Sequence, residues 1–212
     1  MLHNRGTITW FSNIVRLMER TDTLGYLATM TVDNAKLVGN MIQEKLKERF
    51  LNLWTGRMTQ PNRNEINPKL RTYAQFKNDF EFEPYLKILK DIKFRSALTK
   101  FRISAHNLHI ETGRYKRPGQ QKLQPHERLC KICNHNEVDD EIHCLMKCTG
   151  TDQERTELFR YFDNNPDESD KEKFLKIMKS SDENTVKALA KLVLQAQEIR
   201  KPERNRVDVP TP

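Results

Sequence analysis

The sequence has few glycines, no long apolar run and no secretory-signal pattern in its first residues. Its 7 glycines among 212 residues form no Gly-rich phosphate-binding loop. No apolar stretch approaches the about 18 residues that a membrane span requires. The first residues, MLHNRGTITW, lack the basic-then-apolar pattern of a secretory signal. We therefore expect an intracellular protein, nuclear or cytoplasmic, with no membrane partner.

The sequence also lacks the residue sets on which common enzymes depend. No two carboxylates share a sequence context suited to acid-base catalysis, and no serine stands beside a candidate base. The cysteines that could act as nucleophiles are better explained as metal ligands. We predict that the chain is not an enzyme.

Cysteine is scarce, and its placement is informative. All 4 cysteines lie within residues 130–148, where Cys130, Cys133, His143 and Cys148 follow the spacing C-x2-C-x9-H-x4-C. The two-residue gap lets one tight turn present two thiolates to a single ion, and three cysteines with one histidine are a tetrahedral zinc set. Four protein ligands leave no position for water. We therefore predict one structural Zn²⁺, which supplies folding energy and no catalysis.

The zinc segment is expected to contain a short helix. Asp139 is a candidate N-cap, and an apolar stripe follows it, which places His143 on the helix. Residues five apart point about 140° from each other on a regular helix, so Cys148 reaches the same ion only if the last turn loosens. Cys144 could replace His143 as a ligand, and His126 and His135 are weaker candidates for a ligand position. The alternative to a metal site is that the cysteines are buried thiols or form a disulfide.

Positive charge is concentrated in one segment. The net charge is +8 and the pI about 9.3. Residues 87–131 hold twelve Lys or Arg against three acids, an excess of +9 that leaves −1 for the rest of the chain. Charge runs usually mark a solvated face, but this one adjoins the zinc segment. We therefore predict an RNA or DNA partner, single-stranded or structured.

Two groups of side chains are the candidates for nucleic-acid contact. After Asp91, apolar residues recur at helical spacing through Ala105, and the opposite face carries Lys93, Arg95, Lys100 and Arg102. A second group, Arg114, Tyr115, Lys116 and Arg117, combines a base-stacking ring with phosphate-binding cations. The alternative for this group is a surface loop with one packed tyrosine. His106 and His109, which have no neighbouring cysteine, are expected to pack and form hydrogen bonds.

The predicted fold is mainly α: an irregular helical array with a small CCHC-type zinc knuckle inserted between helices. Periodicity and caps predict helices at residues 7–19 and 33–55, after Pro68, Pro84 and Asp91, at 154–162 and 171–179, and from a Ser180–Glu183 capping box to Arg200. We divide the chain into an N-terminal helical segment (1–60), a basic helical segment and loop (61–126), the zinc knuckle (127–150), C-terminal helices (151–201) and a disordered tail (202–212).

Several stretches of residues 67–200 resemble the zinc-binding segment that follows the polymerase in animal non-LTR retrotransposon proteins. They are KLRTYAQFK (69–77), EPYLKIL (83–89), LTKFRISAHNLHIETGRY (98–115), ERLCKICNHNEVDDEIHCLMKC (127–148) and ERTELF (154–159). The most specific parts are residues 104–115 and 139–148. The chain departs from this family at Cys144, where an aromatic residue is common.

The resemblance implies the same four zinc ligands and a role in binding the element's RNA or target DNA beside a reverse transcriptase or within its ribonucleoprotein. The chain itself lacks the aromatic-x-Asp-Asp hairpin of a polymerase. We therefore expect a zinc-dependent nucleic-acid-binding module, either a detached piece of such an element or a host gene derived from one. The alternatives are a helical protein-interaction or scaffold domain with a purely structural zinc, and a retroelement relic without selected activity.

Overall fold

A computed structural model describes residues 10–59, 70, 72–115, 122–163 and 165–201. These residues are mainly α-helical, as the periodicity predicts, and their only β pairing is an isolated antiparallel bridge between Leu129 and Val138. The chain forms two compact units, residues 1–64 and 65–212. The helix start expected at Pro68 and the tail at 202–212 lie outside the described residues.

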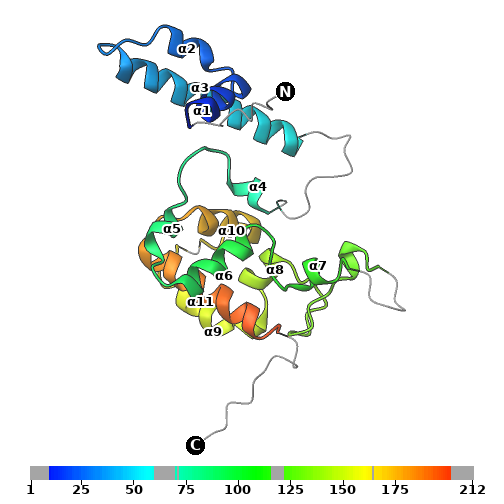
Figure 1. Ribbon diagram of the computed structural model, residues 1–212. Coiled ribbons are helices and arrows are strands. Elements are labelled where there is room, and N and C mark those ends of the chain that lie inside the picture. The colour runs from blue at the N-terminus through cyan, green and yellow to red at the C-terminus, as the bar shows by residue number, and fades with distance from the viewer. Residues whose placement is uncertain (1–9, 60–69, 71, 116–121, 164, 202–212) are drawn as a thin grey trace, which may run out of the picture. The chain divides into compact units, whose positions relative to one another are not determined.

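Figure 1 shows the helices α1, α2 and α3 of the N-terminal unit, and few of the described side chains in this unit are buried. The helices are α1 (Trp10–Arg20), α2 (Leu24–Ala28) and α3 (Ala35–Thr59). The helix α2 was not predicted from the sequence, and α3 continues to Thr59, beyond the predicted end at residue 55. Val38 is buried, but Leu37 and Met41, which helical spacing places on the same side of α3, are 62% and 45% exposed. The apolar positions of α3 drift around its axis, which leaves several of them open to solvent.

The C-terminal unit contains the remaining helices. In chain order they are α4 (Tyr73–Phe76), α5 (Pro84–Ile88), α6 (Ile92–Arg102), α7 (His109–Thr112), the 3-10 turn η1 (Pro125–Glu127), α8 (Glu141–Met146), the 3-10 turn η2 (Thr149–Thr151), α9 (Asp152–Leu158), α10 (Asp170–Lys179) and α11 (Glu183–Glu198). The short helix α7 was not expected.

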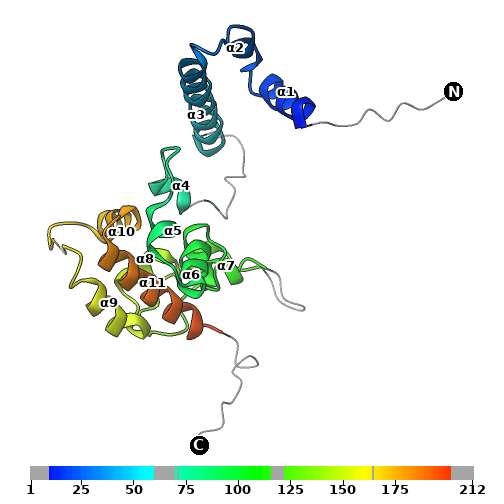
Figure 2. The same cartoon turned by 60° about the vertical axis from the view of Figure 1, so that its left-hand side comes forward.

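The core of this unit forms around α11, which lies between α6 and α9 in both views (Figures 1 and 2). Leu189, Leu192 and Val193 of α11 are at most 1% exposed, as are Phe101 of α6 and Leu158 of α9. The same core includes Cys144 and Leu145 of α8. The segment that carries the candidate metal ligands is therefore packed onto the helical core of its unit.

The start of α11 differs from the sequence-based expectation. The helix α11 is capped by Asp182, whose carboxylate accepts a hydrogen bond from the Thr185 N–H at 2.8 Å, and Ser180 does not cap it. A capping box does occur one helix earlier, between Ser169 and Glu172 at the start of α10. A closer acid thus competes successfully for the N-cap of α11.

Candidate metal centre

Backbone pairing builds the first half of the site. Leu129 and Val138 form the antiparallel bridge, and the Cys130 N–H donates to the Glu137 carbonyl at 2.9 Å. Residues 129–138, which we call the metal loop, therefore fold back on themselves. Asn136 closes the loop in the left-handed region with a φ of 57°, a conformation that asparagine tolerates. This fold-back holds Cys130 and Cys133 on one side of the loop.

The helix α8 supplies the histidine. Its N-cap is Asp140, which accepts from the His143 N–H at 2.8 Å, so the expectation of Asp139 as the cap is wrong by one residue. The helix ends at Met146, and the Cys148 N–H donates to the His143 carbonyl at 2.9 Å, five residues back. Cys148 itself is extended, with φ −60° and ψ 122°. The predicted loosening of the last turn is confirmed.

Four buried side chains converge at this point. One ligand atom each from Cys130, Cys133, His143 and Cys148 lies within 4.8 Å of the others. The Cys130 and Cys148 sulfurs are 3.8 Å apart, and the Cys133 sulfur is 3.3 Å from His143 Nε2. A tetrahedral ion with metal–sulfur bonds of about 2.3 Å separates its sulfurs by about 3.8 Å. The cluster therefore has the donors, spacing and burial to hold one metal ion.

Hydrogen bonding assigns the two nitrogens of His143. Nε2 faces the sulfurs, whereas Nδ1 lies 3.2 Å from the Glu137 carboxylate, which also accepts from Lys147 at 3.1 Å. A carboxylate behind the ligating imidazole fixes its orientation, as in many metal sites. Burial lowers the pKa of His143, but its hydrogen bonds with Cys130 and Glu137 act in the opposite direction and raise it to about 9.

Two of the sulfurs in the cluster are hydrogen-bonded to each other. This hydrogen bond between Cys130 and Cys148 lowers the pKa of Cys130 and raises the pKa of Cys148. Cys130 is therefore the more acidic thiol of the pair, and the thiolate is the form that binds a metal ion.

The rival ligands lie elsewhere. Cys144 is fully buried in the helical core and is not part of the cluster, and burial raises the pKa of its thiol to about 12. His126 and His135 are exposed. The four cysteines are free thiols, so the disulfide alternative is wrong. His106 and His109 form hydrogen bonds with Glu141 and with the Leu129 carbonyl, at 2.8 and 2.9 Å.

The candidate nucleic-acid residues are less uniform than the sequence pattern implies. Lys93, Lys100 and Tyr115 are exposed, and Arg95 is half-buried. Arg114 is also half-buried and pairs with Glu111 at 2.9 Å. Lys116 and Arg117 lie outside the described residues. Of the described members of this set, Lys93, Lys100 and Tyr115 remain open to a partner.

The prediction that Arg102 contacts nucleic acid from the solvent face of its helix is wrong. Arg102 is 5% exposed, and its guanidinium donates to Glu83 at 2.5 Å and to the Met178 carbonyl at 2.6 Å. Its charge also lies 4.4 Å from the ring centre of Phe76 and 4.9 Å from that of Tyr85. The last turn of α6 faces the chain before α5 and the end of α10, which the pattern of α6 alone does not reveal.

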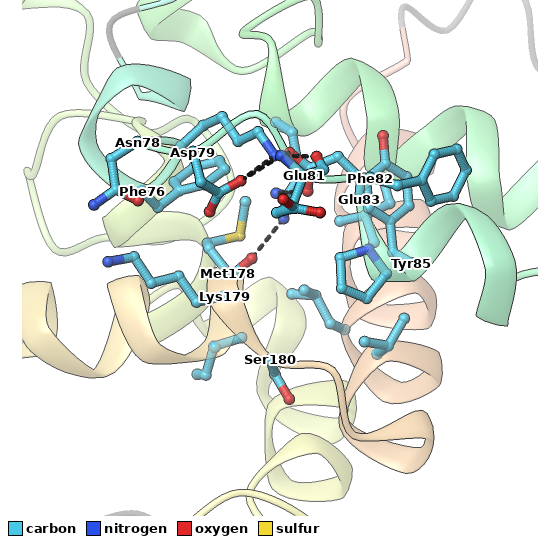
Figure 3. A pocket seen from close by; sticks show the side chains of 17 residues that line it. Phe76, Asn78, Asp79, Glu81, Phe82, Glu83, Tyr85, Met178, Lys179 and Ser180 are labelled. Atoms are coloured by element: carbon cyan, nitrogen blue, oxygen red, sulfur yellow. Dashed lines mark hydrogen bonds and ion pairs between the residues drawn. The ribbon is translucent and has the colours of Figure 1, made fainter. Parts of the chain in front are cut away.

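A cavity of about 230 Å³ opens beside this arginine, and Figure 3 shows Phe76, Glu83, Tyr85 and Met178 around it. Its central carboxylate is paired: Glu83 accepts from Arg102 and from the Tyr73 hydroxyl, and Lys77 lies 3.4 Å from Glu83. Burial and the bond to Glu83 raise the pKa of Tyr73, which keeps it a donor. We assign this cluster a structural role.

The fold and the cluster define a mainly α-helical protein with a buried Cys₃His cluster that could hold one metal ion. Comparison of the chain with protein-family models, with curated proteins and with solved structures finds no match. Within the described residues, no helix is both long and apolar enough to cross a membrane.

Proposed function

We propose that the protein is a non-enzymatic nucleic-acid-binding module whose fold depends on one structural Zn²⁺ held by Cys130, Cys133, His143 and Cys148. Three thiolates and one imidazole at tetrahedral spacing suit zinc better than the harder Mg²⁺ or Ca²⁺, which take oxygen ligands. Four protein ligands close the sphere, so the ion's role would be structural. The convergence of these buried donors is the observation that carries the zinc assignment.

The connection between the metal loop and α7 supports a nucleic-acid surface beside the site. The Ile110 N–H donates to the Asp139 carbonyl at 3.1 Å, and His109 Nδ1 lies 2.9 Å from the Leu129 carbonyl. The loop therefore holds α7, and Tyr115 follows α7 with 64% of its surface exposed. Lys131 is exposed within the loop itself. An ion that orders this loop would position both a stacking ring and a phosphate-binding cation.

The partner we propose is RNA or DNA, single-stranded or structured. The resemblance to the post-polymerase segment of non-LTR retrotransposon proteins supports this choice, as does the +9 excess of residues 87–131. By the same resemblance, a reverse transcriptase or an element ribonucleoprotein is the proposed macromolecular context.

Fluorescence anisotropy with labelled single-stranded RNA and DNA, repeated over a salt series, tests this proposal. The logarithm of the affinity should fall with the logarithm of salt at a slope of about 0.7 per phosphate neutralised. The variants Lys131→Glu and Tyr115→Ala should weaken binding. The control Lys171→Glu, on an exposed lysine at the start of α10, should not. A flat salt response would contradict the proposal.

A second candidate function is protein binding by the N-terminal unit. Leu37, Met41 and Leu53 of α3 are 62%, 45% and 51% exposed, and exposed apolar side chains on one helix suit a protein partner. Under this alternative, zinc would only staple the C-terminal unit, and α3 variants such as Leu53→Asp would abolish partner capture without changing affinity for nucleic acid.

A further inference from the structure

Arg200, just beyond the end of α11, extends into the metal centre from a distant part of the chain. It lies 61 positions from Asp139 in the sequence and 70 from Cys130. Its side chain is 4% exposed. Nη1 donates back to the Ala196 carbonyl of its own helix at 3.0 Å. The guanidinium is therefore held from behind by α11 and faces the metal loop.

The opposite edge of the guanidinium contacts two kinds of anion. Nη2 and Nε donate to the Asp139 carboxylate at 2.7 and 3.1 Å, and that carboxylate is 3% exposed. The same Nη2 lies 3.5 Å from the Cys148 sulfur and 3.7 Å from the Cys130 sulfur. One nitrogen thus faces a carboxylate and two of the four candidate ligand atoms.

The charge of the site explains why a cation belongs there. Three thiolates around a divalent ion carry a net charge of −1, and the neutral imidazole adds nothing. A buried negative charge is costly unless it is paired and hydrogen-bonded. Arginine suits this position because its planar fork can donate to Asp139 and to the sulfurs at the same time, whereas the lysine ammonium is a single point charge.

Packing joins the same two segments. A methyl group at Gly150, just after Cys148, would lie 2.3 Å from Ile132 of the metal loop and 2.9 Å from Ile199 beside Arg200. Only glycine leaves room for these two side chains to approach. The end of α11 and the metal loop therefore both pack against Gly150, in addition to their link through Arg200.

We propose that Arg200 is an outer-sphere residue of the metal centre: it hydrogen-bonds the Cys130 and Cys148 thiolates, retains the ion and ties the end of α11 to the metal loop. This inference rests on the proposed zinc site. Zinc binding and the order of the last turn of α11 should therefore depend on each other. The reason is that the Arg200 guanidinium contacts both the ligand sulfurs and the Ala196 carbonyl of α11.

The variant Arg200→Lys tests the inference, because it keeps the charge and loses the fork. Titration of the zinc-loaded chain with a chromophoric chelator should give about 10- to 100-fold weaker zinc binding, the usual effect of removing an outer-sphere partner. Alkylation of the thiolates by N-ethylmaleimide should also become faster, since a hydrogen-bonded thiolate is a weaker nucleophile.

Arg155→Lys is the matched control. Arg155 donates to the backbone carbonyls of Cys148 and Leu145 and to the Thr151 hydroxyl, so it braces the same segment without touching a sulfur. We expect this variant to leave zinc affinity and alkylation rate near their wild-type values. Equal losses in both variants would mean that general loosening, and not sulfur contact, is responsible, which would overturn the inference.

Hydrogen exchange of the wild-type chain gives a test that needs no variant. Zinc removal should speed exchange at the end of α11, where the Ile199 N–H donates to the Gln195 carbonyl, while exchange within α3, in the other compact unit, should stay unchanged. This inference alone would be overturned if the chain binds zinc but the exchange rate at the end of α11 does not change. It would also be overturned if Arg200→Lys binds zinc with the wild-type affinity. A wild-type chain that binds no zinc would overturn the proposed function together with it.

Discussion

At the scale of single residues, several arginines and lysines of the C-terminal unit have different roles. Arg102, Arg128, Arg155 and Arg200 each donate to backbone carbonyls or buried carboxylates. Lys90, Lys93 and Lys100 are exposed and form no ion pair among the described residues. The physical reason is that arginine offers several donors on a planar, weakly hydrated group, whereas the ammonium favours water. A charge count along the sequence cannot separate the two roles.

Arg102→Met should therefore destabilise the protein without altering nucleic-acid contact. It leaves Glu83, whose side chain is 14% exposed, without its main partner. Breaking a buried ion pair in this way costs about 3–5 kcal/mol. Denaturant unfolding should report that loss, while Lys100→Met, on an exposed site of the same helix, should change the unfolding free energy little. Equal stability of the two variants would contradict the structural role of Arg102.

Cys144→Ala should retain zinc, whereas Cys148→Ala should lose it. Cys144 lies in the helical core with a protonated thiol, and Cys148 is one of the four clustered donors. We expect metal analysis to find zinc in the first variant at the wild-type ratio, and its unfolding free energy to fall modestly because a small cavity forms. Zinc loss from the Cys144 variant would show that the two cysteines had been assigned the wrong way round.

At the scale of elements, the sequence predicts which helices form better than where they begin. Both misplaced caps involve two candidate residues close together, Asp139 with Asp140 and Ser180 with Asp182. Asp139 is not the cap because its carboxylate binds Arg200 and accepts from the His109 N–H at 2.8 Å. Those partners come from distant parts of the chain, and local patterns do not contain them. The loosened turn before Cys148 could be predicted because it depends only on local spacing.

The contribution of Asp182 to stability should depend on pH in a direction that its pKa determines. Hydrogen bonds from the backbone and hydroxyl of Thr185 lower the pKa of this carboxylate below its ordinary value. A group whose folded pKa is lowered stabilises the fold fully above its unfolded pKa, about 3.9 for aspartate, and loses that contribution as the pH falls through the folded value.

The thermal midpoint of Asp182→Ala should therefore lie below the wild-type midpoint at pH 7, and the gap should narrow toward pH 3. Asparagine also caps helices but does not titrate in this range. Asp182→Asn should thus keep most of the stability at both pH values. The assigned cap would be contradicted if the difference in thermal midpoint between the wild type and Asp182→Ala is the same at pH 7 and pH 3.

At the scale of the whole molecule, the helical class could be predicted because apolar periodicity is a local property. The four clustered donors could be predicted because their spacing alone brings them together. The core around α11 and the contact of Arg200 with the cluster could not, since they join residues far apart in the sequence. The roles of zinc and of nucleic acid remain predictions.

The two compact units lead to a prediction about truncation. Residues 65–212 contain the whole buried core around α11 and all four candidate ligands. A chain that begins at residue 65 should therefore keep its zinc content and its unfolding midpoint, as judged by metal analysis and circular dichroism. Loss of zinc on truncation would mean that residues 1–64 contribute to the stability of the second unit.

X-ray absorption at the zinc edge, combined with metal analysis of the purified chain, tests the central claim most directly. We predict one zinc per chain, coordinated by three sulfurs and one nitrogen, because Cys144 lies outside the cluster and His143 Nε2 faces the sulfurs. A chain that takes up no zinc, or a zinc bound by four sulfurs, would contradict the account.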